Sequence, residues 1–373
     1  MNKKKLAFID LTNFKDWPMG GMLQYELNIL PYLCEHYDVD IWGVSVDGKI
    51  NDSLCINKKI YKIHIWTDVK THKRIIPNFW RGLFLKKYIN DFKNYDAIYA
   101  HTATCLIPFF NSGLKAKLIY QQHGLIYLND KILKTKIQVP FMKRAQKQSD
   151  LVFIVSGPKL VKKYSNTMKE HGKFVAIDSP VNTVDVGLKK NQRNVKNRFI
   201  YTGRVTTFKG VDFLVNAFRE YLNTIDQNAH LTIVGDGSLL TSLRQKINNE
   251  GLDNKIQITG KLDHKHISEI LVENNIFVTA SKGEGVSVSV AEANTLGLPV
   301  VCFNVFGLDE QVKDNVNGMK AKSQDINSFV SAMEYVSNHY NRLSVSSLKY
   351  SQKYSSKKIS EKIISNIDKE LSK

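Results

Sequence analysis

The sequence predicts a two-domain α/β protein in which each domain is built on a parallel β-sheet. Its 373 residues exceed one ordinary domain. Short apolar strands alternate with amphipathic helical stretches in both halves, and this alternation is typical of a parallel sheet with helices on its faces. Between the halves, residues 183–198 are polar and basic and lack an apolar period, which indicates an interdomain linker.

The first domain, expected over residues 1–186, begins with a buried strand at Leu6–Asp10. The loop after it contains Gly20 and Gly21, and the leucines of Met22–Cys34 then follow helical spacing. Four more apolar segments are expected to be strands: Val39–Val44, Ala97–Ala100, Leu118–Gln121 and Leu151–Val155. The domain is therefore predicted to be a series of βα units.

The second domain, expected over residues 187–355, has a more regular order. Its expected strands are Phe199–Tyr201, Leu231–Val234, Ile256–Thr259, Ile276–Thr279 and Pro299–Phe303. Its expected helices are Val211–Leu222, Leu239–Asn249, His266–Glu273 and Val288–Leu296. This order predicts a Rossmann-like doubly wound sheet. Isoleucines at helical spacing in residues 356–373 predict a C-terminal helix that docks back on the body.

The chain is strongly basic, with a net charge of +18. Residues 1–186 hold 28 Lys and Arg against 16 Asp and Glu, so most of the excess lies in the first half. Nucleic acid, an anionic membrane or an anionic substrate could use this charge, and a solvated basic surface is the alternative. Basic and aromatic residues alternate over Lys58–Lys87, including Lys58, Lys59, Lys62, Trp66, Lys73, Arg74 and Arg81. Of these explanations we favour peripheral attachment to an anionic membrane surface.

No segment approaches the roughly 20 apolar residues that a membrane-spanning helix needs. The apolar run after Lys3–Lys5 stops at Asp10, which fits a first strand better than a signal peptide. We therefore expect a cytoplasmic protein, attached at most peripherally to the inner face of the cell membrane. The four cysteines are scattered and show neither a disulfide framework nor zinc-ligand spacing. No D-x-D sits at a strand end, so we expect metal independence and no cofactor.

In doubly wound sheets, ligands bind beyond the carboxyl ends of the strands. The strands of the second half are followed by glycine or charged residues, among them Gly203, Gly235 and Gly285, and Leu262 follows shortly after another. Arg204 and Lys209 follow the first of these strands, five residues apart. Two cations at one strand end can hold a diphosphate through charge-assisted hydrogen bonds.

Glu284 and Glu292 are eight residues apart and flank a strand-to-helix turn. A helix that starts near Ser287 or Val288 directs the backbone N–H groups of Val286, Ser287 and Val288 toward the same crevice, where they favour a phosphate. One of the two carboxylates can then face a sugar while the other accepts hydrogen bonds from ribose hydroxyls.

Taken together, residues 199–318 closely resemble the donor-binding half of glycosyltransferase family 4. The family's E-x7-E signature is matched by Glu284 and Glu292, and its A-x-x-x-G-x-P-V-V run by Ala293–Val301. Its G-R and K-G elements are matched by Gly203-Arg204 and Lys209-Gly210, and a later G-x-x-E-x-V segment by Gly307–Val312. Val286 and Ser287 stand where the family often has an aromatic residue. The resemblance implies the GT-B fold, two Rossmann-like domains facing across a cleft.

The resemblance also implies an activity. This is retaining transfer of a hexose or N-acetylhexosamine from a nucleotide sugar, expected to be UDP-linked, to a cell-envelope glycan or lipid-linked saccharide. The enzyme would be a hexosyltransferase of polysaccharide biosynthesis. Glu284 would position sugar hydroxyls, Glu292 would bind ribose, and Arg204 with Lys209 would stabilise the leaving diphosphate. In the first half, Gly20 and Gly21 would approach the diphosphate and His123 would lie near the transferred sugar. The remaining expected donor contacts are Gly203, Gly235, Leu262, Gly285, Val286, Ser287 and Val288.

Two other functions stay open on the sequence. A sugar-nucleotide epimerase can use the same two-domain fold, and a nucleic-acid-binding protein would explain the charge but not the glutamates. A dinucleotide-dependent oxidoreductase is disfavoured, because Leu11-Thr12-Asn13 follows the first strand where G-x-G-x-x-G would be required.

Overall fold

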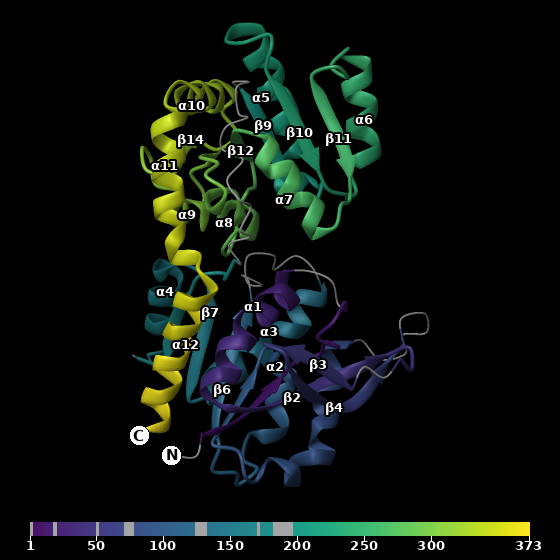
Figure 1. Cartoon of the computed structure of the whole chain (residues 1–373), viewed down its shortest axis with the longest axis vertical. Coiled ribbons are helices and arrows are strands. Elements are labelled where there is room, and N and C mark those ends of the chain that lie inside the picture. The colour runs from purple at the N-terminus through teal and green to yellow at the C-terminus, as the bar shows by residue number, and fades with distance from the viewer. Residues whose placement is uncertain are drawn as a thin grey trace. The chain divides into compact units, whose positions relative to one another are not determined.

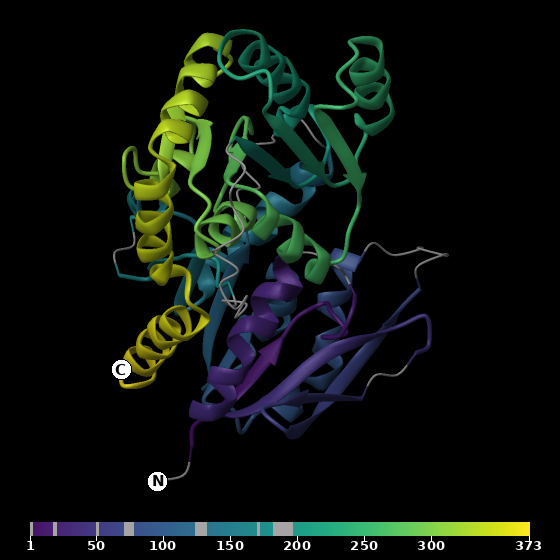
Figure 2. The same ribbon diagram turned by 45° about the horizontal axis from the view of Figure 1, so that its top comes forward.

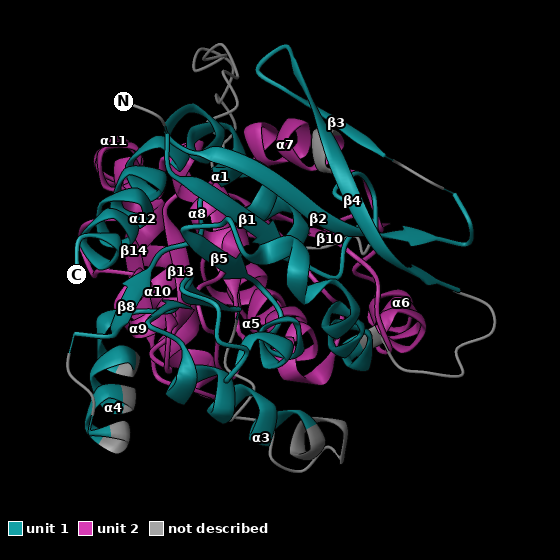
Figure 3. Ribbon diagram, turned by 90° about the horizontal axis from the view of Figure 1, so that it is seen from below, with its two compact units in different colours: residues 1–180, 356–373 teal, residues 181–355 magenta. Residues whose placement is uncertain are grey.

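The protein is described by a computed structural model that covers residues 3–17, 21–49, 52–70, 78–123, 133–169, 172–181 and 197–373. The chain forms two compact units, residues 1–180 with 356–373 and residues 181–355, coloured separately in Figure 3. The domain boundary expected at residue 186 lies in 182–196, outside the described residues.

Unit 1 contains an eight-stranded sheet in the order β3-β4-β2-β1-β5-β6-β7-β8 (Figure 1). Its strands are β1 (Lys5–Ile9), β2 (Asp38–Val46), β3 (Ser53–Ile56), β4 (Lys59–Val69), β5 (Ala97–Ala100), β6 (Lys117–His123), β7 (Leu151–Val155) and β8 (Phe174–Ile177). All pairs are parallel except the β3–β4 hairpin. The strand order reverses between β1 and β5, which creates a switch point at the carboxyl ends of these strands.

Helices connect the strands of unit 1. They are α1 (Gly21–His36), η1 (Asn78–Phe92), α2 (Ala103–Leu106), η2 (Ile107–Phe109), α3 (Leu133–Gln148), α4 (Pro158–Met168) and α12 (Ser356–Leu371). Figure 2 shows α1 in purple along one face of the sheet. The last helix, α12, packs on α1, and Asp368 accepts a 2.7 Å hydrogen bond from the Tyr37 hydroxyl.

Unit 2 contains a six-stranded, all-parallel sheet in the order β11-β10-β9-β12-β13-β14. Its strands are β9 (Arg198–Thr202), β10 (His230–Val234), β11 (Ile256–Gly260), β12 (Ile276–Thr279), β13 (Val300–Phe303) and β14 (Gly318–Ala321). Its helices are η5 (Thr207–Lys209), α5 (Val211–Thr224), α6 (Leu240–Asn249), α7 (His264–Glu273), α8 (Val288–Thr295), α9 (Leu308–Gln311), α10 (Ile326–Asn338), α11 (Tyr340–Ser351) and η6 (Gln352–Tyr354). The switch point lies between β9 and β12.

The sequence predicted every strand and α-helix of the second half from Phe199 to Phe303, with ends that differ by at most two residues, but it missed the short helix η5. It also missed β14 and the helices α9, α10, α11 and η6. In the first half it missed the β3–β4 hairpin, whose strands alternate weakly because most of their residues are exposed or only partly buried. The parallel, fully buried strands were the easier ones to recognise, because they appear as continuous apolar runs.

The β3–β4 hairpin forms one edge of the unit 1 sheet (Figure 3). Ile60 near its turn is 72% exposed, and Lys58, Lys59 and Lys62 beside it are exposed. The lysines of the predicted basic and aromatic surface are therefore exposed on this hairpin. Trp66 is instead buried, and its Nε1 donates a 3.3 Å hydrogen bond to the Arg81 carbonyl. Lys73 and Arg74 lie outside the described residues.

In the part of the chain that the structure describes, no helix combines the length and the apolar character needed to cross a membrane.

Candidate active site

The candidate residues gather at the switch point of each sheet. In unit 2, residues 203–209 follow β9 and residues 281–287 follow β12, so both loops leave neighbouring strands at their carboxyl ends. In unit 1, Asp10 follows β1, His101 follows β5, and His123 ends β6. These are the edges where open α/β sheets bind ligands.

Glycines allow the strand-end loops of unit 2 to touch through their backbones. A Cβ on Gly235, whose φ is +143°, would lie 1.8 Å from the carbonyl oxygen of Gly203. The N–H of Gly235 donates to the Gly260 carbonyl at 2.9 Å, and that of Gly203 donates to the Val234 carbonyl at 3.0 Å. The glycines predicted here as donor contacts thus also hold three adjacent strand ends together, and a side chain at Gly235 would force them apart.

Lys209 and Glu284 form an ion pair across this switch point. Lys209 ends η5 after β9, and Glu284 lies in the loop after β12. Their side chains are 18% and 14% exposed, so the pair is reachable but largely shielded from solvent. The sequence interpretation gave these residues separate partners, the diphosphate and the sugar, and did not foresee that they contact each other. A ligand that binds at this site must either break the ion pair between Lys209 and Glu284 or bind beside it.

The turn that leads into α8 is held by hydrogen bonds of the Ser287 and Gln311 side chains. Ser287 is the N-cap residue, and its hydroxyl accepts a 3.4 Å hydrogen bond from the Val290 N–H. The side chain of Gln311 accepts a 2.9 Å bond from the Ser287 N–H and donates a 2.7 Å bond to the Ser287 carbonyl. The Ser287 N–H, one of the three groups expected to face a phosphate, therefore already has a partner in the protein.

Gly307 supports the same turn. Its φ is +84°, and a Cβ there would lie 2.0 Å from the Glu284 carbonyl oxygen. The N–H of Glu284 donates to the Phe306 carbonyl at 3.0 Å. The segment from Gly307 to Gln311 thus fixes the backbone that carries Glu284 and Ser287.

The other predicted residues of unit 2 differ in how far they are exposed to solvent. Arg204 is exposed, and its carbonyl accepts a 2.8 Å hydrogen bond from the Tyr201 hydroxyl. Glu292 lies in the second turn of α8 and is partly buried, as are Gly285, Val286 and Val288. Leu262 is partly buried and packs against the apolar cluster below β9 and β12.

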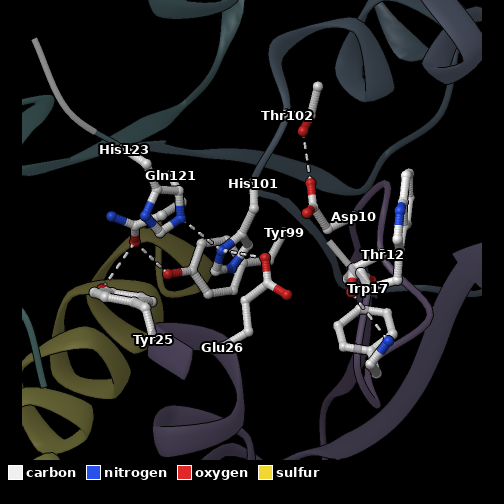
Figure 4. Close-up of polar contacts among 11 residues, drawn as sticks. Asp10, Thr12, Trp17, Tyr25, Glu26, Tyr99, His101, Thr102, Gln121 and His123 are labelled. Atoms are coloured by element: carbon white, nitrogen blue, oxygen red, sulfur yellow. Dashed lines mark hydrogen bonds and ion pairs between the residues drawn. The ribbon is translucent and has the colours of Figure 1, made fainter. Parts of the chain in front are cut away.

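The switch point of unit 1 holds a cluster of buried polar side chains, shown in Figure 4. Nδ1 of His101 lies 2.9 Å from Nε2 of His123 and 3.3 Å from Oε1 of Glu26, which comes from α1. His101 is 3% exposed, Glu26 is fully buried, and His123 is partly exposed. His123, predicted to meet the sugar, is therefore the outermost member of a larger group.

Asp10 extends this cluster toward β1. Its Oδ1 accepts a 2.6 Å hydrogen bond from the Thr102 hydroxyl, and its carboxyl also interacts with the neighbouring carboxyl of Glu26. Burial raises the pKa of Asp10, and burial together with the neighbouring Asp10 carboxyl raises the pKa of Glu26. Both carboxyls therefore favour their neutral forms, as expected for acids without a paired cation.

Burial has the opposite effect on the imidazoles. It lowers the pKa of His123 to about 3, and burial together with His123 holds the pKa of His101 well below its usual range. Both rings are therefore neutral at physiological pH. They stack at 5.1 Å between centroids and lie beside Tyr25 and Tyr99.

Two tyrosines fix the strand that carries His123. The hydroxyls of Tyr99 and Tyr25 donate to Oε1 of Gln121 at 2.5 and 3.2 Å (Figure 4). Gln121 is fully buried on β6, two residues before His123. The end of β6 is thus anchored to β5 and to α1.

Sequence analysis singled out His123 in unit 1 but not Asp10, Glu26 or His101, which the structure places beside it. Strand-end position was a usable signal for Asp10 and His101. The sequence held no such signal for Glu26, because this residue lies inside a helix whose leucine pattern predicted a different buried face. Gly21 is the first residue of α1, while Gly20 lies outside the described residues. Glu26, His101 and His123 each bring one ligand-type atom within 4.8 Å of the others, a grouping that no sequence spacing indicated.

Comparison with known proteins agrees with this geometry. Residues 188–354 match the family model described as Glycosyl transferases group 1. The chain is 26% identical over 348 residues to an uncharacterized glycosyltransferase of Methanocaldococcus jannaschii, with 86% of each chain covered. It is 28% identical over 157 residues to a UDP-Gal:α-D-GlcNAc-diphosphoundecaprenol α-1,3-galactosyltransferase of Escherichia coli, which covers 41% of this chain and 38% of that one.

Among solved structures, Anabaena HepE in complex with UDP superposes with a TM-score of 0.73 at 17% identity, covering 98% of this chain and 100% of the other. This likeness establishes the fold, and the predicted two-domain GT-B architecture is confirmed. The switch-point site of unit 2 lies within the matched residues 188–354. The chain therefore has the GT-B fold, and most of its second unit matches the glycosyl transferases group 1 family model.

Proposed function

We propose that the protein is a retaining hexosyltransferase that uses a UDP-linked hexose or N-acetylhexosamine. The observation that carries the proposal is the Lys209–Glu284 pair at the β9–β12 switch point. Lys209 supplies a fixed cation for the diphosphate and Glu284 an acceptor for sugar hydroxyls, so the two meet where the bond between sugar and phosphate would break. The UDP in the HepE structure supports the choice of nucleotide.

Charge stabilisation of the leaving diphosphate is the main chemical task. As the bond to the sugar breaks, the diphosphate gains negative charge, and Lys209 with the exposed Arg204 can stabilise it without a metal ion. One such donor is often worth about 3–4 kcal/mol of transition-state energy. We propose front-face attack by the acceptor through an oxocarbenium-like state, with Glu292 binding the ribose.

Donor screening tests this proposal. Thermal shift with UDP- and GDP-sugars side by side should select a UDP-sugar. Product analysis by NMR should then give the same anomeric configuration as the donor. Stabilisation by GDP-sugars alone, or an inverted product, would contradict the proposal, and epimerised donor without transfer would indicate an epimerase.

The acceptor is proposed to be a lipid-linked or other cell-envelope saccharide. The galactosyltransferase of Escherichia coli that matches part of the chain acts on an undecaprenol-linked acceptor by its name, which supports this class. In unit 1, exposed Ile60 lies between Lys58, Lys59 and Lys62 on the β3–β4 hairpin. An apolar side chain flanked by lysines suits the interface of an anionic bilayer.

Vesicle flotation tests the membrane part. The protein should float with vesicles that contain phosphatidylglycerol but not with neutral phosphatidylcholine vesicles. Changing Lys58, Lys59 and Lys62 together to Glu should abolish flotation. The charge-matched change of Lys162 and Lys163 on α4 and of Lys169, its C-cap residue, serves as the control. Equal flotation of both variants would show that the hairpin is not the attachment site.

A further inference from the structure

We infer that His101 fixes the tautomer of His123, so that His123 carries its proton on Nδ1 and offers a neutral N–H donor to an oxygen atom of the bound substrate. His101 is thus a positioning residue, with Glu26 as its second partner. The tautomer follows from the geometry of unit 1 alone. That the oxygen belongs to the donor sugar rests on the proposed function.

Nδ1 of His101 is the centre of the arrangement. It lies 2.9 Å from Nε2 of His123 and 3.3 Å from Oε1 of Glu26. The other nitrogen of His101, Nε2, has no hydrogen-bond partner among the described residues. One ring nitrogen therefore faces two polar atoms, and the contacts in Figure 4 converge on it.

A neutral imidazole has one N–H donor and one bare nitrogen that accepts. If His101 carries its proton on Nδ1, this N–H donates to Nε2 of His123 and places its positive end near Oε1 of Glu26, which lies 3.3 Å from the nitrogen. If Nδ1 were bare, its single lone pair would have to serve both neighbours. His123 would then donate to it, and the Glu26 oxygen would either repel it or compete as a second donor.

The alternative also leaves a buried N–H without a partner. With Nδ1 bare, the proton of His101 would sit on Nε2, which no described residue contacts by a hydrogen bond. Orphaned buried N–H groups are rarer in proteins than unsatisfied acceptors. Both considerations favour the proton on Nδ1 of His101, which makes Nε2 of His123 an acceptor and leaves the His123 proton on Nδ1.

A metal ion is a competing explanation for three converging ligand-type atoms. Two ligands of tetrahedral zinc lie about 3.3 Å apart, given bond lengths near 2.0–2.1 Å. The 2.9 Å between the two imidazole nitrogens is shorter and falls in the hydrogen-bond range. The spacing therefore favours a shared proton over a shared ion.

The surroundings keep both rings uncharged. The titratable groups around them are Asp10 after β1, Tyr25 and Glu26 on α1, and Tyr99 on β5. Burial lowers the pKa of both imidazoles. A neutral His123 whose Nε2 accepts from His101 has no lone pair left for a substrate. It can donate a hydrogen bond but cannot act as a general base toward an acceptor hydroxyl.

Nitrogen NMR of the full chain labelled with ¹⁵N-histidine tests the tautomer directly, without substrate. His101→Phe and His123→Gln identify the two rings among the ten histidines. At pH 7.5, a value chosen near neutrality so that both rings are neutral, the wild type should show His123 protonated on Nδ1 and bare on Nε2. In His101→Phe, whose ring can still pack on Phe8 and Tyr99, His123 should lose this single tautomer. His101→Asn, which restores an N–H donor, should recover it.

Three results would overturn the inference. They are a His123 ring protonated on Nε2 or on both nitrogens, an unchanged tautomer in His101→Phe, and stoichiometric zinc binding that shifts both rings. His64→Phe is the matched control, since His64 stacks on Trp42 rather than in the cluster. If His101→Phe does not fold, His101→Asn and Glu26→Gln still report whether the His123 signals depend on these partners.

Kinetics separate this inference from the proposed function. With an active donor, His101→Phe should lower kcat about fivefold with little change in KM, the size expected for one neutral hydrogen bond. A protein that transfers no sugar would contradict the proposed function and leave the tautomer intact. A wrong tautomer in an active enzyme would contradict only the inference.

Discussion

The two switch points of this protein handle charge in opposite ways. In unit 2, Lys209 and Glu284 are ionisable groups of opposite sign that neutralise each other while partly open to solvent. In unit 1, the groups in contact are two carboxyls, two imidazoles, hydroxyls and an amide, all deeply buried or nearly so. Burial without a cation drives these groups to their neutral forms. The same edge of the same kind of sheet can therefore hold fixed charge or neutral hydrogen-bond donors.

The two kinds of site suit different groups of the substrate in the proposed function. A leaving diphosphate becomes more negative, and a fixed cation such as Lys209 stabilises it. A sugar hydroxyl stays neutral, and in the proposed function it would need only a directed donor such as a neutral His123. Variants that alter one switch point at a time test this difference, and they are ordered from the largest expected effect to the smallest.

Removing the cation should have the largest effect. Lys209→Ala should lower kcat by about 10²–10³-fold, because the diphosphate loses a preorganised charge and Glu284 loses its partner. Initial rates with a UDP-sugar measure the change. Lys282→Ala, an exposed lysine in the loop that carries Glu284, should keep nearly full activity. Comparable rates for both variants would remove Lys209 from the site.

Forcing the strand ends of unit 2 apart should come next. Gly235→Ala should cost about 2–3 kcal/mol of stability, since its Cβ would lie 1.8 Å from the Gly203 carbonyl. Gly251→Ala is the control, because its φ of +63° is also left-handed but no atom lies within 4 Å of the added Cβ. It should cost about 1 kcal/mol from backbone strain alone. Urea unfolding compares the two, and equal losses would show that contact at Gly235 is unimportant.

Acidification should reveal that the imidazole of His123 is neutral in the folded protein. The unfolded chain protonates His123 near pH 6.5, whereas burial holds its native pKa at about 3. Between these values the unfolded state binds more protons, so this residue's contribution makes stability fall as pH falls, by up to about 1.4 kcal/mol per pH unit. Asp10 and Glu26, whose pKa values are raised, contribute with the opposite sign.

The measurement is the slope of the unfolding free energy between pH 6 and pH 5, a window chosen below the unfolded-state pKa of histidine. His123→Gln should flatten the decline on acidification relative to the wild type. His64→Gln should not reproduce this change. A slope that His123→Gln leaves unaltered would mean that the ring protonates freely in the native protein.

The smallest effect should come from the support of the α8 turn. Gln311→Ala removes the side chain that holds the Ser287 backbone by two hydrogen bonds, and it should weaken UDP binding about fivefold, close to 1 kcal/mol. Isothermal titration with UDP measures the change. Gln245→Ala, an exposed glutamine on α6, should bind as the wild type does, and a shared loss would point to general destabilisation.

Sequence reasoning could place the parts of the candidate site that depend on chain order. Strand ends, glycines and the position of Glu284 before a helix are local features, so the sequence placed Gly203, Gly235, Lys209 and Ser287 at strand ends, where the structure has them. It did not pair Lys209 with Glu284, because 75 residues separate them and only the adjacency of β9 and β12 brings them together.

The cluster of unit 1 was harder for a physical reason. The leucine spacing in α1 predicted one apolar face, but Tyr25, Glu26 and Asn28 are also buried. α12 returns onto α1, and the amide of Asn28 donates to the Pro180 carbonyl at 3.0 Å. A helix covered on several sides has no single buried stripe, so its polar buried residues cannot be read from periodicity.

The return of α12 to unit 1 has a consequence for synthesis. Unit 1 consists of residues 1–180 and 356–373, so its last helix leaves the ribosome after all of unit 2. Domains generally fold as units, N-terminal first, as the chain emerges. Here the second unit is complete before the first, and α1 must wait for α12 with part of its surface uncovered. A released chain truncated just before Ser356 should therefore contain a folded unit 2 and a protease-sensitive unit 1.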